Sequence, residues 1–195
     1  MKLIQIITIL TLTLFLTSCG GIEKLKISDT SEIGGKKMDT ATFETNYGTF
    51  KIKLFVDEMP ITTGNFIKLA KEGFYDGTKS HRIIARFMIQ GGDPLTKDDS
   101  KKQLWGTGDP GYKIKDEFGE VGNNKGTIAM ANSGPNTGGS QFFINLVNNN
   151  YLDSKHPVFG EVVEGMEIVE KIGAVQTGAR DVPVEDVVIE KVVIS

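Results

Sequence analysis

Cysteine and histidine are scarce in this sequence, which has one cysteine, Cys19, and two histidines, His81 and His156, in 195 residues. A single cysteine cannot form an intramolecular disulfide, and Cys19 lies near the N-terminus, away from the part of the chain that is patterned like a folded domain. Cysteines and histidines do not cluster with the spacing of zinc ligands, so we expect no metal site. A disulfide framework and a cysteine nucleophile are therefore excluded for the domain.

A strong charge of one sign is missing too. The 22 lysines and arginines against 25 aspartates and glutamates give a formal net charge of −3, whereas a general nucleic-acid binder needs a basic face. No glycine-rich phosphate loop precedes a helix, and no serine stands in a nucleophile-elbow context, which argues against covalent hydrolysis. We expect no nucleic-acid partner and no cofactor.

The longest apolar run lies at the N-terminus, from Leu3 to Leu16, after the positive charge of Lys2. A bilayer core of ~30 Å takes ~20 helical residues, so this run is short for a membrane span and suits a secretory signal. It ends in Leu16-Thr-Ser-Cys19-Gly20, which resembles the lipobox of prokaryotic lipoproteins, where the cysteine thiol receives a diacylglycerol. An ordinary signal peptide, or a short uncleaved anchor with an incidental cysteine, is the alternative.

The chain is thus expected to have three parts. Residues 1–18 would be a lipoprotein signal peptide, residues 19–39 a polar, flexible tether that starts at lipidated Cys19, and residues 40–195 the folded domain. An extra strand or helix docked on the domain is the alternative for the tether. This organisation predicts a protein in the cell envelope, lipid-anchored to a membrane and facing the extracytoplasmic side.

From residue 40 onward the pattern predicts many short strands and two helices. Alternation on both sides of Asn46-Tyr-Gly48 predicts a hairpin, and apolar residues at helical spacing after Pro60 predict a helix that Gly73 ends. Such a mixture indicates an antiparallel barrel or sandwich. The expected strands are 41–46, 49–56, 82–84, 87–90, 127–131, 141–146, 158–163 and 187–194, the expected helices are 61–72 and 166–172, and 94–111 is a polar loop.

Two segments stand out as carriers of chemistry. The first is His81-Arg-Ile-Ile-Ala-Arg-Phe-Met-Ile-Gln-Gly-Gly-Asp93, and the second is Gly126-Thr-Ile-Ala-Met-Ala-Asn-Ser-Gly-Pro-Asn-Thr-Gly-Gly-Ser-Gln-Phe-Phe-Ile144. Together they resemble the cyclophilin-type peptidyl-prolyl isomerases, and the resemblance runs from about Thr42 to the C-terminus. It implies a mainly β fold, a closed eight-stranded antiparallel barrel capped by two helices with a groove on its outer face. It also implies isomerisation of bonds preceding proline without metal, cofactor or covalent intermediate.

The resemblance implies that Arg82 is catalytic, since the arginine of the family's His-Arg-Ile-Ile motif points its guanidinium at the prolyl nitrogen. Gln90 matches the glutamine that helps to hold this arginine and contacts the substrate backbone, so it belongs to the implied catalytic set. A lone arginine on a strand is more often a surface salt-bridge residue, and only the surrounding motif favours catalysis. His81 neighbours Arg82 on a strand and should face the other way, which indicates a structural role.

A second group of residues is implied to bind the substrate. Apolar side chains would form a small socket for the proline ring, and the resemblance assigns Phe143 to this pocket and Phe142 to the core, as strand alternation allows. The backbone of Asn132 would hold the residue before proline, and His156 would pack on the proline ring and donate a hydrogen bond. The implied set is Phe87, Met88, Ala131, Asn132, Gln141, Phe143, Tyr151, Leu152 and His156.

Tyr151 departs from the family pattern, because many eukaryotic members have a tryptophan here whose indole N–H donates to cyclosporin. Weak cyclosporin binding is therefore expected. The Pro94–Trp105 loop is longer than in compact members and carries the only tryptophan. Since Trp105 precedes Gly106-Thr-Gly108, which resembles a groove-flanking motif of the family, it is expected to border an extended substrate site.

We therefore expect a monomeric peptidyl-prolyl isomerase whose partners are proline-containing unfolded or newly exported proteins. The alternative is a proline-peptide-binding chaperone or adaptor that uses the same groove with little turnover. Arg82 favours catalysis, because binding alone needs no cation at the prolyl nitrogen. A structural envelope lipoprotein is a third possibility, and it leaves the groove residues unexplained.

Overall fold

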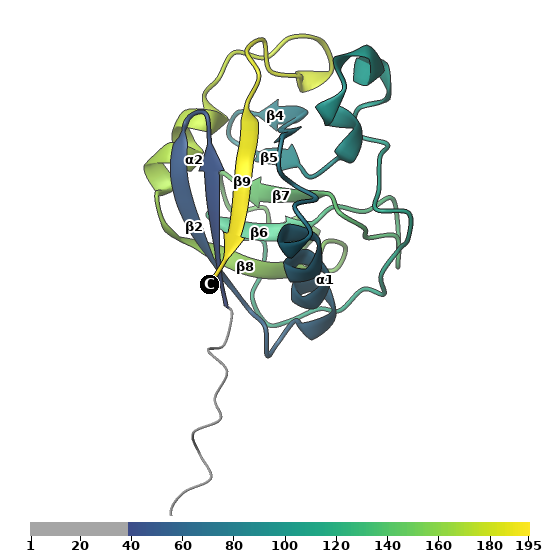
Figure 1. Cartoon of the computed structure of the whole chain (residues 1–195). Helices are drawn as coiled ribbons and strands as arrows, with labels where there is room; N and C mark the ends of the chain where they lie inside the picture. The colour runs from purple at the N-terminus through teal and green to yellow at the C-terminus, as the bar shows by residue number, and fades with distance from the viewer. Residues whose placement is uncertain (1–38) are drawn as a thin grey trace, which may run out of the picture. The chain divides into compact units, whose positions relative to one another are not determined.

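The computed structural model describes residues 39–195, which form a curled antiparallel sheet with two α-helices and short 3-10 helices (Figure 1). The predicted signal peptide and Cys19 lie outside the described residues, as does the predicted tether apart from Asp39. The elements are β1 (Thr40–Thr45), β2 (Gly48–Leu54), α1 (Pro60–Lys71), β3 (Thr78–Lys79), β4 (Arg82–Ile84), β5 (Met88–Gly91), η1 (Pro94–Lys97), η2 (Asp99–Leu104), β6 (Thr127–Met130), β7 (Phe142–Asn145), η3 (Asn150–Leu152), β8 (Val158–Glu164), α2 (Met166–Gly173), η4 (Ala179–Asp181) and β9 (Val188–Ile194).

The sheet has nine strands in the order β3-β9-β1-β2-β8-β6-β7-β5-β4. Its edge strands, β3 and β4, are neighbours in the sequence, so the chain passes from one edge to the other through Ser80 and His81. The Ser80 N–H donates to the Val187 carbonyl at 2.9 Å, on the β9 side, and the His81 N–H donates to the Gln90 carbonyl at 3.1 Å, on the β5 side. The sheet therefore curls until its two edges meet, although no ladder pairs β3 with β4 in the described residues.

The predicted closed barrel of eight strands is wrong in both strand number and closure. Strand β3 has two residues, too few for any alternation to appear in the sequence. Closure requires a hydrogen-bonded ladder between the last strands, with a fixed shear, and an apolar pattern along one chain does not specify this. The antiparallel, mainly β architecture and the two α-helices are confirmed.

Most of the predicted elements are confirmed for recognisable local reasons. The predicted hairpin is β1 and β2, with Thr45 paired to Gly48 across the turn. Helix α1 begins at Pro60, which needs no N–H partner in the first turn, and Gly73 follows it with a φ of +68°, a left-handed conformation that favours glycine. Helix α2 at Met166–Gly173 and strand β9 at Val188–Ile194 also fall where they were predicted.

The predicted polar loop 94–111 contains the two 3-10 helices η1 and η2. The carboxylate of Asp93 accepts the Leu95 N–H at 2.7 Å, and that of Asp98 accepts the Ser100 N–H at 3.0 Å. Each aspartate thus satisfies a backbone donor at a helix N-terminus. Trp105 follows η2, and its indole N–H donates to the Leu95 carbonyl at 3.1 Å, which folds the loop back on itself.

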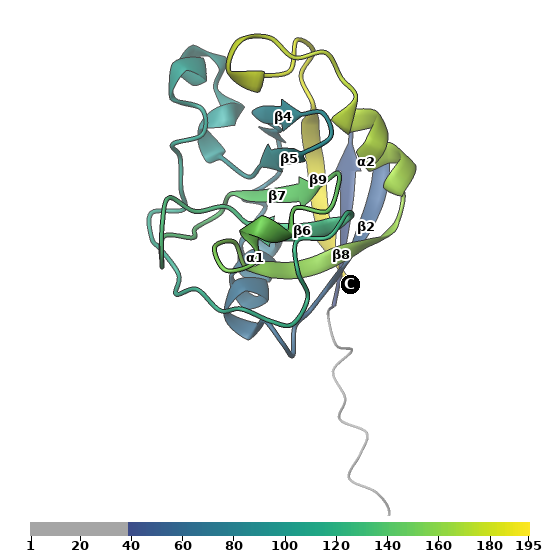
Figure 2. The ribbon, with the colours of Figure 1, turned by 180° about the vertical axis from the view of Figure 1, so that it is seen from behind.

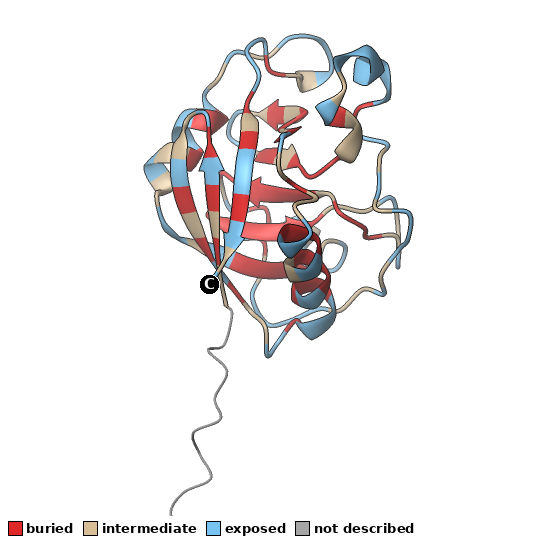
Figure 3. Ribbon diagram, in the orientation of Figure 1, coloured by how far each residue is buried: buried red, intermediate tan, exposed pale blue. Residues whose placement is uncertain are grey.

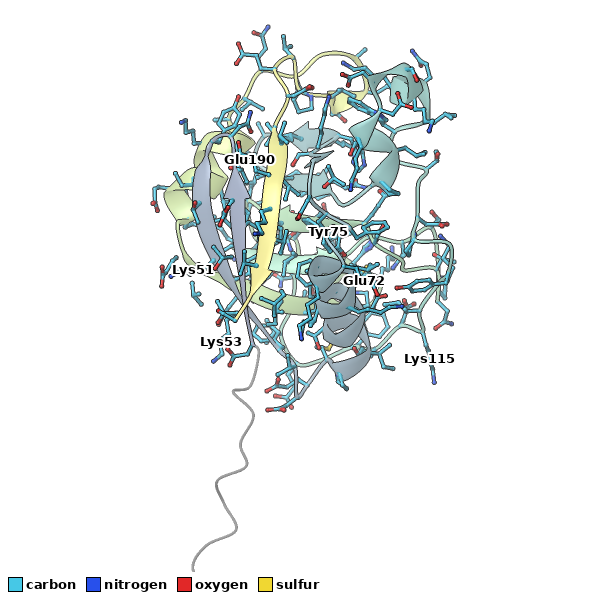
Figure 4. All side chains as sticks on the ribbon, viewed as in Figure 1. Lys51, Lys53, Glu72, Tyr75, Lys115 and Glu190 are labelled. Carbon is cyan, nitrogen blue, oxygen red and sulfur yellow. The ribbon has the colours of Figure 1, made fainter. Side chains whose placement is uncertain are left out.

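The main hydrophobic core fills the inner face of the sheet and is rich in aromatic rings. Phe43 meets Phe142 edge-on at 5.7 Å, and Tyr75 is fully buried beneath α1, where burial raises its pKa well above the usual value. Figure 4 shows Tyr75 beside α1, whereas Lys51 and Lys53 project outward from β2. This alternation between buried and outward side chains is the one expected for a strand with one wet face.

Strands β6 and β7 differ from the outer strands because every one of their residues is buried, as Figure 3 shows. The residues of these strands that point away from the main core are therefore covered as well, and they include the apolar side chains of Ala129 and Phe143. Within residues 39–195 no helix is long and apolar enough to cross a membrane. The outer face of β6 and β7 is where the candidate site lies.

Candidate active site on the outer face of the sheet

A row of directly paired residues crosses four strands and starts at Arg82. Arg82 on β4 pairs with Gln90 on β5, Gln90 pairs with Phe143 on β7, and Phe143 pairs with Ala129 on β6. Residues directly opposite each other on neighbouring strands point to the same face of a sheet. The next residues along these strands, such as Ile83, belong to the main core, so the row lies on the outer face.

An apolar cluster separate from the main core sits on this outer face. Met88 and Phe143 are almost fully buried in it, at 2 % and 5 % exposure, together with Ala129 and Val158. The sequence predicted five of the cluster's members as substrate-binding residues, and the structure brings those five together: Phe87, Met88, Ala131, Phe143 and Leu152. Figure 2 shows the strands that carry this cluster, β5, β7, β6 and β8, side by side.

Two further ring side chains border the cluster. The imidazole of His156 meets the Phe143 ring edge-on at 5.4 Å, and the ring of Tyr151 stacks on Phe87 at 6.5 Å. Tyr151 is 67 % exposed, so its ring extends the apolar surface outward without closing it. The segment 151–156 therefore forms one wall around the cluster.

The protonation of His156 follows from its surroundings. Burial lowers the pKa of the imidazole, and Nδ1 lies 3.2 Å from the Met130 carbonyl, which can only accept. The neutral ring therefore carries its proton on Nδ1 and keeps Nε2 as an acceptor. Nε2 of this tautomer therefore cannot donate the hydrogen bond that was expected from His156 to a substrate, and the ring packs edge-on against Phe143.

The polar wall is a chain of side-chain amides. The Gln90 amide donates to Gln141 at 3.0 Å, and the Gln141 amide donates to the carbonyls of Gly106 and Gly108 at 3.1 and 2.8 Å. These groups border a cavity of about 280 Å³ that Ala131 also lines. The amide of Gln90 therefore donates to Gln141, and in residues 39–195 no hydrogen bond joins the side chains of Gln90 and Arg82.

Asp93 holds the backbone of residues 106–108, whose carbonyls accept from Gln141, and the sequence did not predict this role. Its fully buried carboxylate accepts the backbone N–H groups of Gly106 and Gly108 as well as that of Leu95. At Gly108 an added Cβ would lie 2.1 Å from the carboxylate, so only glycine fits. The available signal was an aspartate directly after Gly91-Gly92 and before Pro94, which is typical of a helix N-cap.

Asn132 connects two walls of the site. Its side-chain amide donates to the Lys155 carbonyl at 2.7 Å, and the N–H of the preceding Ala131 donates to the Gln141 carbonyl at 3.0 Å. The backbone at residues 131 and 132 therefore runs along the floor between the amide wall and the segment 151–156.

Arg82 stands at the open end of the row with its side chain 43 % exposed. Its Nε lies 3.4 Å from the carboxylate of Asp181, in η4. Trp105 and Asp181 line the cavity of about 340 Å³ that adjoins Arg82, so Trp105 borders the site. His81 also lines this cavity but is buried, with both ring nitrogens unpaired, and burial lowers its pKa to about 4.

The site thus combines a small apolar socket, a polar wall of amides and a guanidinium on the outer face of a curled sheet. In residues 39–195 no group of three or more histidine, cysteine, aspartate or glutamate side chains could hold a metal ion. A family model described as cyclophilin type peptidyl-prolyl cis-trans isomerase/CLD matches residues 40–194. The chain therefore belongs to the cyclophilin-type peptidyl-prolyl cis-trans isomerases.

Individual relatives agree with this assignment. The chain is 46 % identical over 140 residues to peptidyl-prolyl cis-trans isomerase-like 1 of Rhizopus delemar, a match that covers 71 % of this chain and 82 % of the relative. It is 39 % identical over 148 residues to peptidyl-prolyl cis-trans isomerase CYP18-2 of Arabidopsis thaliana, covering 75 % and 87 %. A crystal structure of a Cryptosporidium parvum cyclophilin-type isomerase has a TM-score of 0.74 at 31 % identity, covering 81 % and 98 %.

The comparisons overturn the predicted location. The relatives are isomerase-like 1 and CYP18 proteins of fungi, plants and mammals, and their names denote no lipoprotein or envelope form. The family match covers residues 40–194, so the N-terminal residues on which the predicted location depended lie outside it. We correct the expectation of a lipid-anchored envelope protein accordingly and do not carry it forward.

Proposed function

We propose that this protein accelerates cis/trans rotation of X-Pro bonds in unfolded polypeptides, with Arg82 donating a hydrogen bond to the prolyl nitrogen in the twisted transition state. The observation that carries the proposal is the cross-strand row, which puts the Arg82 guanidinium and the Phe143 ring on one face with only Gln90 between them. A proline ring seated against Phe143 would have its nitrogen within reach of that face.

The chemistry needs no covalent step. Amide resonance sets a barrier of ~18–20 kcal/mol, and uncatalysed isomerisation takes tens of seconds or more. Acceleration to milliseconds is ~10⁴-fold, which corresponds to about 5–6 kcal/mol. The prolyl nitrogen becomes pyramidal as the C–N bond twists, and only then can it accept a hydrogen bond. A donor placed there lowers the energy of the twisted state more than that of the planar one.

The apolar cluster supplies the socket for the ring. Met88 and Phe143 form its base, Leu152 and Phe87 border it, and the edge of His156 lies against Phe143. A thioether and aromatic faces suit the compact, apolar proline ring. A solved structure of the Cryptosporidium parvum isomerase in the presence of the dipeptide Ala-Pro is also similar to this chain, with a TM-score of 0.73 at 31 % identity.

The polar wall would receive the residue before proline. Its backbone would run along Ala131 and Asn132, and its side chain would enter the cavity bordered by Gln141 and Gly108. The narrower prediction of newly exported substrates depended on the location corrected above, so the proposal covers unfolded chains with accessible X-Pro bonds.

A protease-coupled isomerisation assay on an Ala-Pro-Phe type peptide tests this function. We expect the protein to increase the rate of the cis-to-trans phase in proportion to its concentration. A protein that binds the peptide in an equilibrium measurement but leaves this phase unchanged would be a proline-peptide-binding module, and the proposal would then be wrong.

A further inference from the structure

The contact between Arg82 and Asp181 joins residues far apart in the sequence. Strand β4 carries Arg82 into the site, and the short helix η4 near the C-terminus carries Asp181 to it, with Nε and the carboxylate 3.4 Å apart. Both side chains are about half exposed, at 43 % and 44 %. Within residues 39–195, the cavity beside Arg82 is lined by one further charged side chain besides Arg82 and Asp181, that of Arg180.

The η4 segment holds Asp181 in a defined place. The Arg180 guanidinium donates to the carbonyls of Lys102 and Gln103 in η2, at 3.0 and 3.2 Å. Arg180 and Asp181 both adopt left-handed backbone conformations, with φ of 61° and 60°. Non-glycine residues keep such a conformation only where the surrounding structure imposes it, which here includes the turn closed by the Gly178 N–H and the Val182 carbonyl at 2.8 Å.

The geometry of the pair leaves the reactive side of Arg82 available. Asp181 contacts Nε, so the two terminal nitrogens of the guanidinium are not taken up by this carboxylate. A half-exposed arginine without a partner samples many rotamers, and only some of them present a terminal N–H to the prolyl nitrogen. A partner at Nε reduces that freedom without occupying the donor that the reaction needs.

We propose that Asp181 is a positioning residue, which orients Arg82 for donation to the prolyl nitrogen. This inference rests on the proposed function, because it assigns a role in preparing the donor that the function requires. Arg180 contributes indirectly, because its hydrogen bonds to η2 fix the loop that carries Asp181.

The effect is expected to be small but measurable. The distance of 3.4 Å is long for a hydrogen bond, and exposed ion pairs contribute little in water. We expect Asp181→Asn to lower kcat by about 2- to 5-fold with peptide affinity unchanged. Asparagine tolerates the left-handed backbone, so the loop should keep its shape and the melting temperature should stay close to that of the parent protein.

Salt dependence distinguishes positioning from a merely structural role. Attraction between half-exposed charges is screened, so the rate ratio of the parent protein to Asp181→Asn should fall toward one between about 0.01 M and about 1 M salt. Asp186→Asn is the matched control, because Asp186 pairs with Lys79 at 2.6 Å and does not contact Arg82. The control should keep the parental rate at both salt concentrations.

A double-mutant cycle separates this inference from the proposed function. If Asp181 acts through Arg82, Asp181→Asn should cause no further loss in an Arg82→Ala background. An unchanged or increased rate in the single Asp181→Asn variant, or equal losses in both backgrounds, would overturn the positioning role while leaving a catalytic Arg82 intact. Full activity of Arg82→Ala would instead refute the proposed function, and the positioning role with it.

Discussion

Phe142 and Phe143 are adjacent on β7 and serve different parts of the molecule. The Phe142 ring packs in the main core, edge-on to Phe66 at 6.0 Å, whereas the Phe143 ring packs on the outer face, edge-on to His156 at 5.4 Å. Both rings are buried, at 3 % and 5 % exposure. The same strand therefore stabilises the fold with one face and, with the other, builds the apolar cluster that we propose as the substrate socket.

Alanine substitutions should separate these two roles. Phe142→Ala removes a ring from a packed aromatic core and should lower the free energy of unfolding by ~3–5 kcal/mol. Phe143→Ala should cost less stability, because its cavity opens toward the groove, and should reduce kcat/KM more per unit of stability lost. Urea unfolding and isomerase kinetics on both variants test this, and a larger stability loss for Phe143→Ala would contradict the assignment of the two faces.

Strand alternation made it predictable that one of these two rings points inward and the other outward, and it also placed most strands correctly. The helical spacing of apolar residues placed both α-helices. The pairing of Arg82 with Asp181 was not predictable, because a contact between distant loops has no local pattern. The Gln90–Gln141 hydrogen bond escaped prediction for a related reason, since the resemblance assigned Gln90 to Arg82 while the actual register places Gln141 within reach. The curl that brings the two edges of the sheet together without a closing ladder depends on a two-residue strand and on the curvature of the other strands, which no short window of sequence encodes.

His81 should make stability sensitive to mild acid. Its folded-state pKa of about 4 is below the unfolded value of 6.5, because burial disfavours the charged ring. The unfolded chain therefore binds the extra proton first, and stability falls as pH drops from about 6.5 toward 4, by about 3 kcal/mol in total. His81→Leu should remove this component. The difference in the free energy of unfolding between the variant and the parent should therefore change between about pH 6.5 and pH 4. A difference that is constant with pH would contradict a buried, neutral His81.

Gly108 should be intolerant of any side chain. A Cβ at this position would lie 2.1 Å from the Asp93 carboxylate, which holds the backbone of the Gly106–Gly108 segment. We expect Gly108→Ala to lower stability by ~1–3 kcal/mol and to weaken peptide binding. Gly64→Ala is the control, since Gly64 lies inside α1 with nothing within 4 Å of its Cβ position, and it should stabilise the protein by ~0.5–1 kcal/mol. Equal stability of the two variants would refute the supporting role of Asp93.

Tyr151 should limit cyclosporin binding. Tyrosine has a smaller apolar face than the tryptophan of many family members and places its donor elsewhere, so affinity should be ~1–3 kcal/mol weaker than in those members. Tyr151→Trp should increase cyclosporin affinity in a calorimetric titration and leave the isomerase rate nearly unchanged, because this exposed ring lies at the border of the socket. An unchanged affinity would mean that another part of the groove, such as the Pro94–Trp105 loop, determines inhibitor binding.

The kinetics of Arg82→Ala test the proposed function most directly. Loss of a donor that acts in the twisted state should lower kcat by at least ~10²-fold and change peptide affinity much less. Arg86→Asn is the matched control, because Arg86 is an exposed arginine of the same hairpin with a φ of 59°, which asparagine tolerates. The account predicts near-parental turnover for this control and a large, turnover-specific loss for Arg82→Ala. Equal losses of affinity and turnover in Arg82→Ala, or activity close to that of the parent, would contradict it.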